Sequence, residues 1–113
     1  MAITVGTYVQ RDDGWLEASV SQSVAGAADV ILAAVASQGI EVKLIEGTMS
    51  AAGTLSLLSD AVPLIGTLDL LGSTPFKLEG LYVPINTGLK LTTVTGAFRG
   101  RIVFRPRAKL VLA

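Results

Sequence analysis

The residues that could do chemistry are few, and their spacing fits no catalytic or metal site. Asp12-Asp13-Gly14 resembles the start of a calcium loop, but it lacks the further oxygen ligands and the distal Glu. Neighbouring carboxylates on a strand face opposite ways, so this pair is also no acid/base pair. The chain has no His and no Cys. It therefore lacks the usual general base, a thiol nucleophile and the commonest zinc ligands.

Other reactive motifs are also missing from the sequence. Gly47 and Gly53 are not followed by the Lys-Ser/Thr of a phosphate loop, and no Ser-x-x-Lys spacing occurs. We therefore expect no enzymatic activity, no cofactor and no bound metal.

Basic residues gather at alternating positions near the C-terminus. These positions are Arg99, Arg101, Arg105, Arg107 and Lys109. On an unbroken strand they would share one face, opposite Ile102 and Phe104. We expect Pro106 to interrupt the strand, so the shared face is predicted only for residues 99–105.

This arginine stripe reflects a wider separation of charge along the chain. Residues 1–79 contain nine acidic and three basic residues, a net charge of −6, and residues 80–113 contain six basic residues and no acid, +6. The stripe could be a solvated strand face, since edge strands often carry Lys and Arg. It could instead meet an acidic surface on an identical neighbour or another protein. Nucleic acid is disfavoured, because interleaved aromatic residues are missing and the whole chain is neutral.

The elements that must position these residues are predicted to be β-strands. Twelve Gly and four Pro divide the chain into short pieces, as in a β-sandwich or barrel. Apolar and polar residues alternate in segments 40–44, 54–57, 67–70, 89–92 and 101–105. In the first, this pattern places Ile40, Val42 and Leu44 on one buried face. We expect an antiparallel all-β sandwich.

The connections between these segments also suit a β fold. Residues 51–53 form a short link, as in a hairpin, and Pro63 suits an edge or the start of a strand. Residues 72–75 and 84–88 are predicted loops, and residues 95–97 a tight joint. The Ala-rich segment 25–36 could be helical by propensity, but the β context favours a buried strand at residues 29–32.

The composition is too apolar for the surface of a typical soluble monomer. Half of the 113 residues are apolar and 16% are charged, against about 25% charged in average domains. The most apolar stretch, residues 30–42, is broken by Gln38, Gly39 and Glu41 and is too short to span a membrane. The N-terminus has no signal-peptide pattern. We therefore expect other protein chains to cover part of the surface.

The first 24 residues differ in character from the rest. We expect an arm or hairpin at residues 1–24 and one sandwich domain at residues 25–113. The only Trp of the chain is Trp15, and Trp is enriched at interface cores, although packing on its own domain is an equal alternative. The candidate protein-contact residues are Tyr8, Trp15, Arg99, Arg101, Arg105 and Arg107.

Residues 30–105 resemble small structural proteins of tailed bacteriophages. The segments that carry the resemblance are Ala-Val-Ala-Ser-Gln-Gly (34–39), Ile-Glu-Val-Lys-Leu (40–44), Ser-Ala-Ala-Gly-Thr-Leu-Ser-Leu (50–57), Leu-x-Gly-x-Leu-x-Leu (64–70), Leu-Tyr-Val-Pro (81–84), Gly-Leu-Lys-Leu-Thr-Thr (88–93) and Val-Thr-Gly-Ala-Phe-Arg-Gly-Arg-Ile-Val-Phe-Arg (94–105). The resemblance implies a jelly-roll-like sandwich that works as a dimer or trimer on the virion.

Two functions follow from this resemblance. The first is a capsid decoration (cement) protein, made in the host cytoplasm, that binds the major capsid protein on the outer shell and bridges its subunits. The alternative is a receptor- or glycan-binding head of a fibre or tail. Sugar sites use exposed aromatic rings with flanking carboxylates or amides, and this chain has only one Trp, two Tyr and one Asn.

Overall fold

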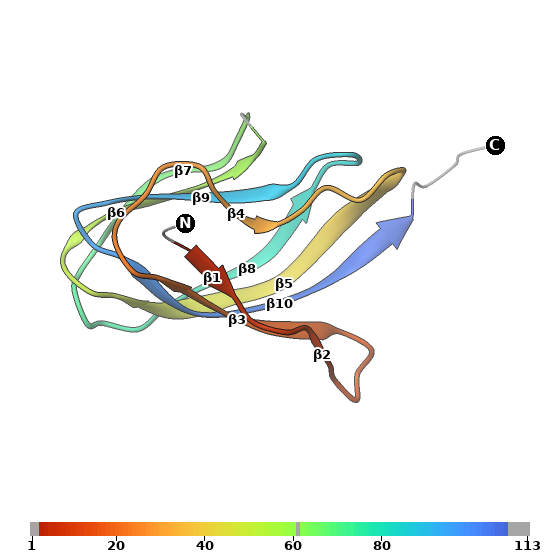
Figure 1. Cartoon of the computed structure of the whole chain (residues 1–113), viewed down its shortest axis with the longest axis horizontal. Helices are drawn as coiled ribbons and strands as arrows, with labels where there is room; N and C mark the ends of the chain where they lie inside the picture. The colour runs from red at the N-terminus through yellow and green to blue at the C-terminus, as the bar shows by residue number, and fades with distance from the viewer. Residues whose placement is uncertain (1–2, 61, 109–113) are drawn as a thin grey trace.

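The structure, a computed structural model, describes residues 3–60 and 62–108. These residues form ten strands and no helix (Figure 1). The strands are β1 (Ile3–Val5), β2 (Val9–Gln10), β3 (Leu16–Gln22), β4 (Asp29–Leu32), β5 (Gln38–Met49), β6 (Gly53–Ser59), β7 (Val62–Leu70), β8 (Phe76–Val83), β9 (Leu89–Val94) and β10 (Phe98–Ala108).

The strands build two antiparallel sheets. Sheet A has the order β1-β3-β10-β5-β8, with β2 also paired to β3, and sheet B has the order β4-β9-β6-β7. The pairs β3·β10, β4·β9, β5·β8 and β6·β7 are nested, so that from β3 onward each earlier strand pairs with a progressively less distant later one. The expected all-β antiparallel sandwich is confirmed (Figure 1).

The core lies between the two sheets and follows from the alternation of apolar residues. In β6, Leu55 and Leu57 point inward and are buried, and Leu91 in β9 is buried beside them. Sheet A contributes Ile102 and Phe98, both fully buried. Each such side chain contributes about 1.5–3 kcal/mol by leaving water, so these inward faces hold the two sheets together.

The prediction for β5 is correct at Ile40 and Val42 and wrong at Leu44. The first two are buried, but the third buried position is Ile45, and Leu44 is only partly buried. The cause is a β-bulge, because the register of β10 against β5 shifts at this point and leaves Lys43 without a partner on β10. An extra residue in one strand reverses the side-chain alternation beyond it.

The predicted hairpin at residues 51–53 is wrong. This link joins β5 in sheet A to β6 in sheet B, and the two strands do not pair. The next two strands, β6 and β7, do form a hairpin, which turns at Asp60 with a positive φ of 53°. The expectation that Pro63 suits an edge strand is confirmed, since β7 ends the order of sheet B.

Pro106 does not interrupt the last strand, contrary to expectation. β10 continues to Ala108, and Pro106 pairs with Ile40 of β5. On the other side β3 ends at Leu16, opposite Phe104, so β10 has a free side at the proline. A residue without an N–H is tolerated at such an edge position.

The two segments of ambiguous character both belong to the sandwich. The Ala-rich segment forms the strand β4 at the predicted residues 29–32. In the segment 1–24, β3 lies between β1 and β10, and Ile3, Ala18 and Val20 are buried in the core. The described part of this segment is therefore built into sheet A.

A buried glutamine links the two sheets. The amide oxygen of Gln22 in β3 accepts hydrogen bonds from the Thr93 hydroxyl, 2.8 Å away, and from the Phe98 N–H, 2.9 Å away. Its amide nitrogen donates to the Asp29 carboxylate at 2.9 Å. Because Thr93 and Asp29 belong to sheet B, one side chain satisfies polar groups of both layers.

Candidate functional site

The arginine stripe lies on the outer face of sheet A. Arg99, Arg101 and Arg105 are exposed, while Ile102 and Phe104 between them are buried, as predicted. The strand that carries them is not an edge strand, because β10 is paired with both β3 and β5. Arg107 belongs to the same strand, but its side chain and Lys109 lie outside the described part of the chain.

Carboxylates from the two neighbouring strands pair with two arginines of this stripe, Arg101 and Arg105. The Arg101 guanidinium forms ion pairs with Glu46 of β5 and Glu17 of β3. The hydrogen bond to Glu46, together with that to Glu17, raises the pKa of Arg101 above its ordinary value. Arg105 donates from Nε to Glu41 at 3.1 Å. The oppositely charged halves of the sequence thus meet within one sheet, where Arg101 and Arg105 are paired with carboxylates.

Trp15 lies beside this network, immediately before β3. The Arg105 guanidinium lies over its ring, 4.3 Å from the centroid, and the Lys43 ammonium is 5.4 Å from it. Cations over an indole face are attracted by its quadrupole. Of the candidate contact residues, the structure therefore brings Trp15 and Arg105 together.

The Asp12-Asp13-Gly14 segment forms the turn between β2 and β3. The Asp13 carboxylate accepts a hydrogen bond from the Trp15 N–H at 3.2 Å and contacts Arg11 and Lys43 at 3.3 and 3.5 Å. Desolvation acts to raise the pKa of Asp13, but the Trp15 hydrogen bond and the two cations outweigh it, so that this pKa lies below its ordinary value. The oxygens of this carboxylate are thus already used by the protein's own donors.

Tyr8 does not join the other candidates. Its ring packs edge-on against Phe104, with centroids 5.0 Å apart and planes at 81°. Phe104 points to the inner side of sheet A, whereas Trp15 contacts Arg105 on the outer side. The two aromatic residues singled out in the sequence therefore serve different faces.

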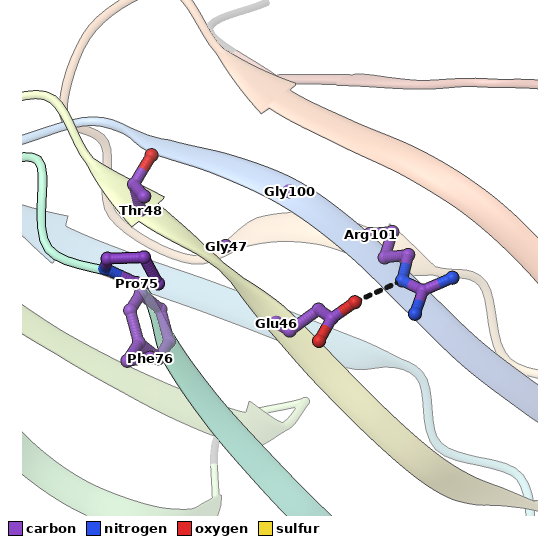
Figure 2. Close-up of a pocket in the computed structure, with 7 residues that line it drawn as sticks. All are labelled: Glu46, Gly47, Thr48, Pro75, Phe76, Gly100 and Arg101. Carbon is purple, nitrogen blue, oxygen red and sulfur yellow. Dashed lines mark hydrogen bonds and ion pairs between the residues drawn. The ribbon is translucent and has the colours of Figure 1, made fainter.

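A shallow hollow lies over sheet A where two glycines face each other. Gly47 of β5 pairs with Gly100 of β10, and a Cβ built on Gly100 would lie 2.0 Å from the Glu46 carbonyl oxygen. Figure 2 shows the hollow between the Glu46–Arg101 ion pair on one side and Pro75 and Phe76 on the other. The glycines are needed for the close approach of these two strands.

The outer face of sheet B was missed by the sequence reasoning, although the alternation carried the signal. The outward side chains include Val30, Thr54, Ser56, Leu58, Asp69, Lys90, Thr92 and Val94. Only Asp69 and Lys90 among them are charged, whereas most charged residues of the described chain lie on sheet A or its β2–β3 turn. Val94 is 55% exposed. The outer face of sheet B thus carries fewer charged side chains than the outer face of sheet A.

The described residues offer several surface hollows lined by polar and apolar side chains. In residues 3–60 and 62–108, no group of three His, Cys, Asp or Glu side chains could hold a metal ion. None of the described segments is a helix of the length and apolar character needed to cross a membrane. No family model matches the chain, and no curated protein and no solved structure matches it either.

Proposed function

We propose that this chain is a capsid decoration protein that attaches to the major capsid protein through the outer face of sheet B. The observation that supports this is that this face carries fewer charges than the outer face of sheet A and exposes Val94 and Val30 among hydroxyl side chains. Interface cores are depleted in charged residues. The resemblance of residues 30–105 to structural proteins of tailed bacteriophages is the reason for proposing a phage capsid as the assembly to which the chain attaches.

The size of this face bears on how attachment would work. Four strands about 4.8 Å apart and about 3.3 Å per residue give an area on the order of 400 Å² over the six residues of β9. A standard interface uses about 800 Å² per partner. One copy of this face is therefore too small for a stable contact by itself. A dimer or trimer would bind the repetitive shell through several such faces at once, and so gain affinity through avidity.

The edge of sheet B provides a second apolar surface for such an oligomer. Val62 at the start of β7 is 65% exposed, and Leu71 just after its end is 70% exposed. An unpaired edge strand is a template for a strand of another chain. The nested pairing of β3 to β10 also supports the jelly-roll form of the sandwich, a double-sheet architecture found in capsid proteins.

The attachment can be tested by placing a charge on either face. Ser56→Glu puts a carboxylate in the middle of the outer face of sheet B, and Ser21→Glu makes the same change on the outer face of sheet A. We expect at least a tenfold loss of co-sedimentation with shells stripped of this chain for the first variant alone, because a buried unpaired charge is costly. Equal binding of both variants would contradict the proposal.

A further inference from the structure

A cleft of about 560 Å³ lies on the outer face of sheet A, at the end away from the glycine hollow. The residues that matter for its chemistry are Trp15, Glu41, Lys43, Glu79, Gly80 and Tyr82. We call it the Trp15–Tyr82 cleft. Its position is independent of sheet B, so it is not explained by attachment to a shell.

The cleft exists because two neighbouring strands are irregular at the same place. Lys43 is the bulge residue of β5, and its neighbour on β8 is Gly80, which has a φ of +72°. A Cβ built on this glycine would meet no atom within 4 Å. The missing side chain therefore leaves open space above the sheet, bounded by longer side chains.

The two aromatic walls are held in place before any ligand arrives. Arg105 lies over the Trp15 ring and is itself fixed by its ion pair with Glu41. The Tyr82 ring lies against Gly39, where a built Cβ would be 2.4 Å from the phenol oxygen. Tyr82 nevertheless remains 46% exposed. Rigid aromatic side chains lose little entropy when they bind.

The charges at the cleft balance each other. Glu41 pairs with Arg105, Glu79 lies 3.6 Å from Lys77, and Lys43 lies 3.5 Å from Asp13. A cationic ligand would compete with the two cations already placed against Trp15. An anionic ligand would face two carboxylates.

We propose that the Trp15–Tyr82 cleft binds a neutral oligosaccharide. Sugar rings have apolar C–H faces that suit aromatic side chains, and their hydroxyls both donate and accept hydrogen bonds. Glu41 and Glu79 offer acceptors for these hydroxyls, and Lys43 offers a donor. Apolar and aromatic walls with a few well-placed polar groups are typical of small-ligand sites.

The row of backbone positions that carries the two aromatic residues indicates a ligand of more than one sugar unit. Arg105, Glu41 and Tyr82 are register partners across β10, β5 and β8, and Trp15 continues the same row beside Arg105. The row covers three strand spacings, or about 14 Å. A subunit attached through sheet B would present this cleft away from the shell, toward a glycan-bearing surface.

Trp15 is the only Trp, so its fluorescence reports directly on the cleft. A printed array of neutral and charged glycans selects the probe, and the best neutral trisaccharide is then titrated while Trp15 emission is recorded. We expect a saturable change, at least a tenfold weaker Kd for Tyr82→Ala, and near-normal binding for Tyr82→Phe, which keeps the ring.

Tyr8→Ala is the matched control, since Tyr8 is similarly exposed, at 48%, but lies outside the cleft. It should bind as the wild type does, and thermal unfolding of each variant reports on folding. No neutral glycan bound on the array, binding of charged glycans only, or a Kd unchanged by Tyr82→Ala would overturn the proposal. Attachment to shells should be unaffected by Tyr82→Ala, which separates this site from the sheet B face.

Discussion

Replacing Gln22 by Leu should destabilise the protein strongly, because this side chain joins the two sheets. The substitution removes the acceptor of the Phe98 N–H and of the Thr93 hydroxyl, whose residues are 0% and 4% exposed. A buried donor left without a partner costs about 1–3 kcal/mol. Two such donors, partly offset by the gain of an apolar side chain, give an expected loss of about 3 kcal/mol.

This loss is measured by urea unfolding and by Tm. A change of about 3 kcal/mol corresponds to roughly 12 °C in Tm for a domain of this size. Gln10→Leu is the control, because Gln10 is exposed in β2, and it should change stability by less than about 0.5 kcal/mol. Equal stability of the two variants would refute the linking role of Gln22.

Two further variants separate the hydrogen bonds from simple packing. Thr93→Val combined with Gln22→Leu should lose less than the sum of the single losses, since the two side chains are bonded to each other. Gln22→Glu would place a carboxylate against that of Asp29, now 2.9 Å from the amide nitrogen. A proton held between the two carboxyl groups removes this repulsion, and the two groups are close together only in the folded state. The loss of stability caused by Gln22→Glu should therefore become smaller as pH falls below 7. Additive stability losses in the double variant, together with a loss for Gln22→Glu that does not depend on pH, would contradict these hydrogen bonds.

Three other changes test the packing and charges of sheet A. Arg101→Met should lose about 1 kcal/mol in urea unfolding at low salt and less at 1 M salt, because two exposed ion pairs disappear. Arg99→Met, without an ion pair in the described chain, should lose less, and equal losses would contradict this role. The lowered pKa of Asp13 means that its stabilising effect is full above the unfolded pKa, about 3.9, and disappears as pH falls through the folded value. The difference between Asp13→Asn and wild type in thermal unfolding should therefore be larger at pH 6 than at pH 2, and a constant difference would be inconsistent with it. Gly100→Ala should lose about 2 kcal/mol in urea unfolding by forcing β5 from β10, whereas Gly66→Ala, with no atom within 4 Å, should be nearly neutral; equal effects would argue against the close approach.

The local pattern of the sequence was sufficient to predict many of the strands and most of their faces, although it did not predict β8. Alternation placed Leu55 and Leu57 inside, and the same alternation puts Thr54 and Ser56 outside. It failed at Lys43, because a bulge adds one residue without a distinctive sequence signal. A single extra residue was enough to exchange Leu44 for Ile45 in the core.

The pairing of distant strands could not be predicted from the sequence. The carboxylates that neutralise Arg101 lie 84 and 55 residues earlier in the chain, at Glu17 and Glu46. No local propensity reports such a contact, since it depends on which strands become neighbours in sheet A. For the same reason Tyr82 was not recognised as the partner of Trp15 in one cleft.

Cryo-electron microscopy of the virion that carries this chain tests its proposed role most directly. We expect density for the two-sheet sandwich on the outer surface of the shell, with the outer face of sheet B against the major capsid protein and the Trp15–Tyr82 cleft facing outward. Density at the tail tip alone, or a sandwich that meets the shell through sheet A, would contradict the proposed attachment.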